Sequence, residues 1–139
     1  MMKKLLSLAV VFGLITALSV NAGTQIKKGK TRPLTTKQLM SGLVKPQCAD
    51  LGETMKTPPT DDKGWDALAT RAALLNEVSY ILMDDDRCPD ADWAAAAKTL
   101  REGTDALLAK IEAKDAAGAQ EAFKGATASC AACHKAHKK

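Results

Sequence analysis

The sequence predicts an all-α protein that folds as an up-down-up-down antiparallel four-helix bundle. Four segments carry apolar residues at three- and four-residue steps, which is the period of one helix face. Each segment begins at a residue type that caps helices and ends in a short polar or proline-containing connection. No segment shows the strict alternation or the Val, Ile and Thr richness of strands. Helices joined by short connections lie antiparallel to their neighbours, so this bundle is the simplest packing.

The first expected helix begins at Thr35 or Thr36 and contains a proline, Pro46. Proline lacks an N–H group and clashes with the preceding turn, so we expect a kink or an interruption there. Residues 56–59 end the segment. Its apolar positions are Leu39, Met40, Leu43, Val44, Leu51 and Met55.

The other three helices follow expected caps at Thr60 or Asp61, at Asp90, and at the turn Lys114-Asp115. The second has its inner face at Trp65, Leu68, Ala72, Leu75, Ser79 and Leu82, and the third at Trp93, Ala97, Leu100, Thr104, Leu107 and Ile111. The fourth has it at Ala119, Phe123, Ala126, Cys130, Cys133 and His137.

The first 22 residues have the three parts of a secretory signal peptide. Lys3 and Lys4 form the basic start, residues 5–20 are apolar, and Val20-Asn21-Ala22 places small residues before a cleavage point. The apolar run is short for an uncleaved membrane anchor, which is the alternative interpretation. We expect a periplasmic protein without a stable membrane anchor after processing.

The rest of the chain fits a flexible lead-in at residues 23–34 and one domain at residues 35–139, because 139 residues suit a single domain. The formal net charge is +4, and cleavage would remove two lysines and no acidic residue. Nucleic-acid binding needs a concentrated basic face, which this sequence lacks. We therefore expect no nucleic-acid partner.

Cys130-Ala131-Ala132-Cys133-His134 has the C-x-x-C-H spacing of covalent haem attachment. Residues three apart share a helix face, so both thiols can reach the two vinyl groups on one porphyrin edge. His134 then lies where its imidazole can bind the iron. The alanine-rich third and fourth helices and only five aromatic residues leave room for a large flat group. We expect one covalently bound haem c.

Two other interpretations of the motif fit the sequence less well. A thioredoxin-like redox pair needs a βαβ context, and no strand is predicted before the motif. A structural zinc site needs a fourth ligand, and only His137 lies nearby in the sequence.

The signal peptide, the four predicted helices and a single C-x-x-C-H motif within ten residues of the C-terminus resemble the class II cytochromes c. This is the cytochrome c′ family, including its low-spin methionine-ligated relatives. The resemblance covers residues 35–139. In that family a basic residue commonly stands four places after the ligating histidine, which implies a proximal haem contact for Lys138. The preceding place is often aromatic, whereas this chain has His137 there.

The resemblance also implies that a side chain of the first helix covers the sixth iron position. Met40 is the candidate distal ligand, and methionine raises the reduction potential and removes the open position. Leu39 and Leu43 are its apolar competitors, while Met55 and Met83 are placed less well. Methionine on an apolar helix face is also ordinary core filling.

Cys48 and Cys88 remain once the haem is attached, and an oxidising compartment favours a disulfide between them. Such a bridge requires that the loop holding Cys88 folds back, or that the first helix breaks at Pro46. Two free cysteines and a disulfide between chains are the alternatives. We also expect an exposed His137, and a solvated helix end, not a calcium site, at residues 84–86.

The expected function is single-electron transfer between periplasmic redox partner proteins, with Lys135 and Lys138 available for docking. The alternative is a five-coordinate haem that binds NO or CO as a scavenger or sensor. Peroxide or nitrogen-oxide chemistry ranks last, because the distal side offers no acid–base pair and we expect no enzyme. The pattern fits either a monomer or a homodimer.

Overall fold

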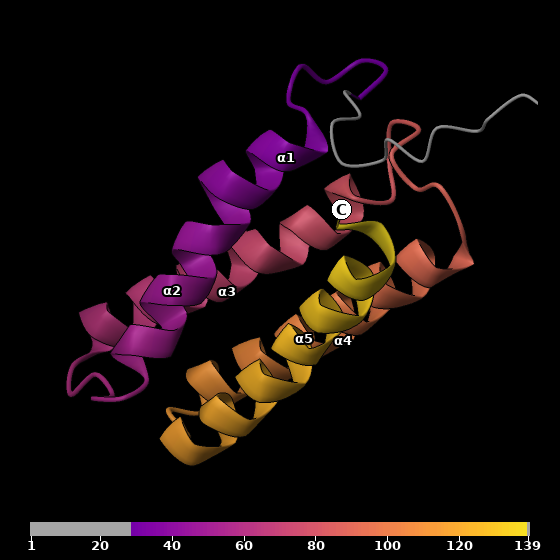
Figure 1. Cartoon of the computed structure of the whole chain (residues 1–139). Coiled ribbons are helices and arrows are strands. Elements are labelled where there is room, and N and C mark those ends of the chain that lie inside the picture. Colours follow the sequence, from indigo (N-terminus) through magenta and orange to yellow (C-terminus); the bar gives the residue numbers. More distant parts are fainter. Residues whose placement is uncertain (1–28, 139) are drawn as a thin grey trace, which may run out of the picture.

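The computed structural model describes residues 29–138, which are all-helical as predicted (Figure 1). The expected signal peptide, residues 23–28 of the lead-in and residue 139 lie outside the described residues. None of the helices within 29–138 has the length and apolar character needed to cross a membrane. The elements are α1 (Thr36–Leu39), the π-helical turn η2 (Met40–Val44), α2 (Lys45–Thr54), α3 (Asp62–Ile81), α4 (Ala91–Glu112) and α5 (Ala116–His137).

The elements α1, η2 and α2 form one continuous first helix, which runs through Pro46. A π-helical turn takes the place of the expected kink. The residues that join α1, η2 and α2 all have right-handed helical backbone angles. Pro46 has no N–H to donate to the carbonyl four residues earlier, and its ring crowds that carbonyl. In the wider turn the N–H of Lys45 reaches back to the carbonyl of Met40. The π turn therefore accommodates the proline, and it begins at Met40.

The helix N-termini are capped as the sequence predicts. Thr35 forms a capping box, because its hydroxyl accepts from Gln38 N at 3.2 Å while Gln38 Oε1 accepts from Thr35 N at 2.9 Å. The carboxylates of Asp61, Asp90 and Asp115 accept from the third backbone N–H of α3, α4 and α5 at 2.8–2.9 Å. Each such cap stabilises its helix by about 1 kcal/mol.

The core lies along the helix faces that the sequence predicts. All six predicted inner positions of the second helix, which are five in α3 and its C-cap Leu82, and all six of α4 are buried, and Val78 and Ala96 join them. Polar contacts also link neighbouring helices: Asn76 Nδ2 donates to Thr104 Oγ1 at 2.9 Å, and Arg71 binds Asp50 at 2.5 Å. Figure 1 shows α5 beside α4 and the first helix beside α3.

Helices α4 and α5 approach closely at Gly103. A Cβ atom on Gly103 would lie 2.7 Å from the Cα atom of Ala126, closer than real Cβ contacts. Residue 103 therefore has no space for a side chain. The small residues of these two helices allow this close backbone approach.

Residues 29–34, which the sequence assigns to a flexible lead-in, are bound to the loop between α3 and α4. Asp85 accepts from Thr31 N at 2.6 Å, from Thr31 Oγ1 at 2.9 Å and from Arg32 N at 2.9 Å. Its side chain is only 5% exposed, so the expectation of a solvated acidic helix end is wrong for Asp85. Burial alone would raise the pKa of this carboxyl, but the hydrogen bonds from Arg32 and Thr31 outweigh burial and lower the pKa.

Candidate functional site

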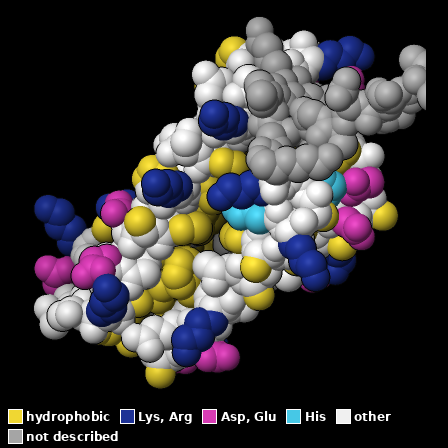
Figure 2. Space-filling view, in the orientation of Figure 1, with side chains coloured by type: hydrophobic (Ala, Val, Ile, Leu, Met, Phe, Trp, Pro, Cys, Tyr) yellow, Lys and Arg dark blue, Asp and Glu magenta, His cyan; other side chains and the backbone are white. Residues whose placement is uncertain are grey.

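The C-terminal part of α5 and the first helix both line one apolar hollow (Figure 2). It holds about 440 Å³ of space between the atoms, part of it open to solvent. Among residues 29–138, Ser129 and His134 are its only polar lining residues apart from the thiols. The lining residues are Met40, Val44, Leu82, Trp93, Ala96, Ala97, Leu100, Ser129, Cys130, Cys133 and His134.

The C-x-x-C-H motif lies on the last turns of α5, and its three functional residues all line the hollow. Cys130 and Cys133 are half-buried, whereas the two alanines between them are exposed. This is the arrangement that a three-residue spacing gives on a helix, because residues three and four apart share one face. His134 is exposed but borders the same hollow. Two thiols and one imidazole thus face one apolar space.

Met40 lines the hollow from the first helix, together with Val44. Leu39 is 2% exposed in the core, and neither Leu39 nor Leu43 lines the hollow. Both are the apolar alternatives to Met40 that the family resemblance implies for the sixth iron position. Met40 is the first residue of the π turn and Val44 the last, so the turn sets which side chains of the first helix face the motif.

The remaining wall comes from the end of α3 and the first half of α4. Trp93 is held there by its indole Nε1–H, which donates to the carbonyl of Leu82 at 2.7 Å. Ala96 and Ala97 follow on α4 and occupy little volume beside the motif. The sequence places Leu82, Trp93, Ala97 and Leu100 on inner faces. Their shared role as a wall of the hollow depends on how the helices pack, which periodicity does not reveal.

The thiols of the motif are neutral at physiological pH. Burial raises the pKa of Cys130, and a hydrogen bond from Ser129 opposes this effect. Burial also raises the pKa of Cys133, to which Cys130 and Asp90 add. The pKa of Cys48 is raised to about 11 by burial and, second, by Cys130. Cys48 lies on α2 and is half-buried.

The expected disulfide between Cys48 and Cys88 is not formed, and all four cysteines are free. The bridge required a first helix broken at Pro46 or a loop folded back onto it. The helix continues through Pro46, and the loop instead binds residues 29–34. Cys88 Sγ lies 3.4 Å from the carbonyl of Asp90, at the start of α4, while Cys48 lies on α2.

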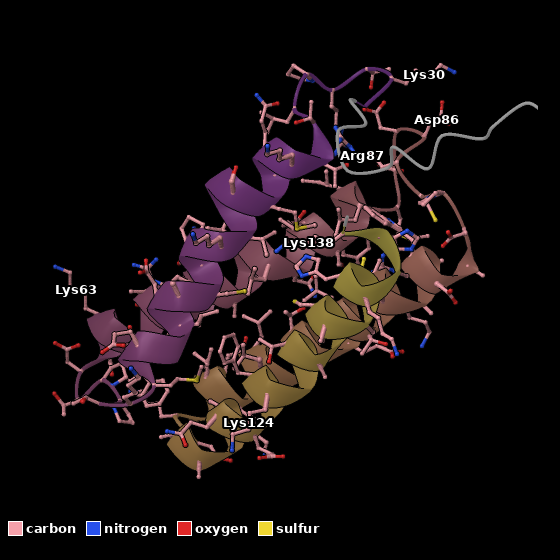
Figure 3. The ribbon with its side chains drawn as sticks, in the orientation of Figure 1. Lys30, Lys63, Asp86, Arg87, Lys124 and Lys138 are labelled. Atoms are coloured by element: carbon pink, nitrogen blue, oxygen red, sulfur yellow. The ribbon has the colours of Figure 1, made fainter. Side chains whose placement is uncertain are left out.

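His137 is not the exposed side chain that the sequence suggested. Its ring packs edge-on against Trp93, with ring centroids 5.3 Å apart, and its Nε2 lies 3.4 Å from Asp90 Oδ1. Lys138, labelled in Figure 3, is exposed at the end of α5, and its backbone N–H donates to the carbonyl of His134 at 2.9 Å. His137 thus joins the end of α5 to the start of α4.

Comparisons with family models, with curated proteins and with solved structures each find no match to this chain.

Proposed function

We propose that this chain is a periplasmic c-type cytochrome that transfers single electrons through one covalently attached haem c. Cys130 and Cys133 hold the haem, His134 ligates its iron, and Met40 is the sixth ligand. One observation carries the proposal: the C-x-x-C-H residues and Met40 line the same apolar hollow. When bound, the haem supplies reversible one-electron chemistry between ferric and ferrous iron.

The hollow suits a haem in its chemistry. Its lining is apolar apart from Ser129, His134 and the thiols, and such surroundings keep water from the iron and favour the less charged, reduced state. Ala96 and Ala97 line the same hollow as Cys133, and their small side chains take up little of its volume. The lining includes no Asp, Glu, Lys or Arg side chain within residues 29–138. This lack of an acid–base pair favours an electron carrier over an enzyme.

The role of Met40 decides between the electron carrier and the gas-binding alternative. A thioether bound to iron occupies the position that NO or CO would need. The other first-helix residue at the hollow, Val44, has no atom that can ligate iron. Electron transfer therefore depends on Met40, and a five-coordinate, gas-binding haem would result if Met40 stayed off the iron.

The bundle that holds this site is proposed to be antiparallel, with its helices in up-down-up-down order. The contacts between helices support this order. Lys114, just after α4, binds Asp62 at the start of α3 at 2.6 Å, whereas Trp93 at the start of α4 binds Leu82 just after α3. For α4 and α5, Lys110 near the end of α4 binds Asp115 at the start of α5. Trp93 at the start of α4 packs against His137 at the end of α5.

The docking surface for a redox partner is proposed to be the face around the motif. Lys135, which directly follows His134 in the sequence, and Lys138, which is labelled in Figure 3, are both exposed. Positive charges near the haem would speed encounter with an acidic partner surface, and this effect would weaken as salt increases.

Covalent attachment is tested by producing the full chain in a host that attaches haem to c-type cytochromes. We expect haem absorbance that stays with the polypeptide after extraction with acidified organic solvent. The double variant Cys130→Ala/Cys133→Ala should lose it, whereas the control Cys48→Ala/Cys88→Ala should keep it. Haem that never stays on the wild-type chain, or that stays on the Cys130/Cys133 variant, would overturn the proposal.

A further inference from the structure

Arg87 carries a buried positive charge that its surroundings satisfy only in part. The residue is 1% exposed and its side chain is fully buried. Nη2 donates to the carbonyl of Leu34 at 2.7 Å, but Nε and Nη1 have no hydrogen-bond partner in the part of the chain that the structure describes. A buried charge with unsatisfied N–H groups costs several kcal/mol, by order of magnitude, so a missing partner is implied.

The nearest carboxylate does not fill this role. Asp85 Oδ2 lies 3.8 Å from Arg87 Nη2, beyond hydrogen-bond distance. Both oxygens of Asp85 are already used by Thr31 and Arg32. No Asp or Glu precedes Asp50 in the sequence, so the residues before 29 supply no carboxylate either.

Arg87 does not itself line the hollow, but the chain connections place the loop that holds it next to one end of the hollow. The hollow follows α4 from Leu100 to Trp93, a rise of about 10 Å for seven residues. Ala126 of α5 lies against Gly103 of α4, and Cys130 follows Ala126 by one helical turn. Cys130 therefore lies at the Leu100 end of the hollow. At the other end, Trp93 binds the carbonyl of Leu82, five residues before Arg87.

Arg87 also joins the two walls that meet at this end. The carbonyl that it holds belongs to Leu34, six residues before Met40 on the first-helix wall. Its own loop leaves the wall formed by Leu82. Figure 3 shows Arg87 between the segment that precedes α1 and the end of α3. A group attached at Cys130 and extending along the hollow would therefore bring its far edge toward Arg87.

We propose that Arg87 binds a propionate carboxylate of the haem, through the Nε–H and Nη1–H groups that the protein leaves free. This inference rests on the proposed function. A haem attached through its vinyl groups at Cys130 and Cys133 has its two carboxylates on another edge, and guanidinium groups bind carboxylates strongly. Arg87 is then a positioning residue that holds the far edge of the haem and keeps its carboxylate ionised.

The charge of Arg87 should be visible in the reduction potential. A positive charge near the iron disfavours the ferric state, so its removal lowers the potential. Without Arg87 the propionate protonates at a higher pH, and the potential should then fall with rising pH within the ordinary carboxyl range. Other charged groups near this end are Lys30, Arg32, Asp84, Asp85, Asp86, Asp90 and His137.

The test compares the wild-type holoprotein with Arg87→Met, Arg87→Lys and the control Arg71→Met, whose arginine binds Asp50 between α2 and α3. Covalent haem is measured first, because its absence from the wild type refutes the proposed function itself. The midpoint potential is then measured across pH. We expect a lower and more pH-dependent potential for Arg87→Met, a smaller shift for Arg87→Lys and no shift for Arg71→Met.

An Arg87→Met potential that coincides with the wild type at every pH would overturn the inference. If Arg87→Met does not mature, resonance Raman spectra of the wild-type holoprotein give a second readout through the propionate bending modes. We expect one propionate to stay ionised below the ordinary carboxyl pKa range. Two propionates that both titrate in that ordinary range would contradict the role of Arg87.

Discussion

Met40 and His134 line the same apolar hollow, one from the first helix and the other from the last. The thioether and the imidazole are the two side chains of the hollow, besides the thiols, that can ligate iron. The π turn that Pro46 imposes begins at Met40, so the proline and the candidate ligand belong to one local structure. The predictions below test this hollow and the packing that forms it.

Replacement of Met40 by leucine should open the iron. The side-chain volume is nearly kept, so the fold should lose less than about 1.5 kcal/mol. The reduced protein should change from a low-spin to a high-spin absorption spectrum and should bind CO, and its midpoint potential should fall.

The matched control is Met55→Leu, because Met55 is buried in the core and does not line the hollow. Its spectrum and potential should equal those of the wild type. A Met40→Leu spectrum that is still low-spin and insensitive to CO would show that another group is the sixth ligand.

Replacement of Gly103 by alanine should destabilise the bundle. The new Cβ would lie 2.7 Å from the backbone of Ala126, so α4 and α5 must separate. Overpacking costs about 1–3 kcal/mol and exceeds the roughly 0.5–1 kcal/mol that alanine gains over glycine within a helix. Thermal or urea unfolding measures the difference.

Gly125→Ala is the control for this change, because a Cβ there meets no atom within 4 Å. It should stabilise the protein by about 0.5–1 kcal/mol. Equal effects of the two substitutions would contradict the close contact at Gly103.

Asp85 should make the attachment of residues 29–34 sensitive to acid. Its pKa is lowered in the folded protein, so its contribution to stability is present above the unfolded-state pKa of about 3.9 and is lost as pH falls through the folded-state pKa. Asp85→Asn should therefore lower the free energy of unfolding at neutral pH, and the difference from the wild type should shrink toward about pH 2. Asp86→Asn, at an exposed neighbour, should show little change at any pH. A constant difference at all pH values would argue against this role of Asp85.

Two thiols should remain in the mature protein. All four cysteines are free in the structure, and the proposed haem attachment would use only Cys130 and Cys133, leaving the thiols of Cys48 and Cys88. Denatured holoprotein that has not been reduced should thus react with two equivalents of a thiol reagent. If no thiol reacts, Cys48 and Cys88 form the disulfide that the sequence suggested. The loop or the first helix would then have to rearrange.

The helix pattern and the caps could be predicted from the sequence because they depend on local chemistry. The carboxylates of Asp61, Asp90 and Asp115 need only the backbone N–H groups of the next turn. The inner faces of α3 and α4 follow from the three- and four-residue spacing of their apolar residues alone. The spacing of Cys130 and Cys133 likewise requires that both thiols share one face.

The features that were not predicted depend on contacts between distant segments. The sequence suggests Met40 as the distal residue but leaves Leu39 and Leu43 as alternatives, and only the π turn and the packing decide which one faces the hollow. A buried Asp85 needs residues 29–34 as partners. His137 is enclosed only because Trp93 and Asp90 at the start of α4 lie beside the end of α5.

The absorption spectrum of the mature, reduced wild-type protein, recorded with and without CO, tests the central claim most directly. A covalently bound haem held by His134 and Met40 should give a low-spin spectrum that CO leaves unchanged. A high-spin spectrum that shifts as soon as CO is added would contradict ligation by Met40 and would establish the gas-binding alternative in its place.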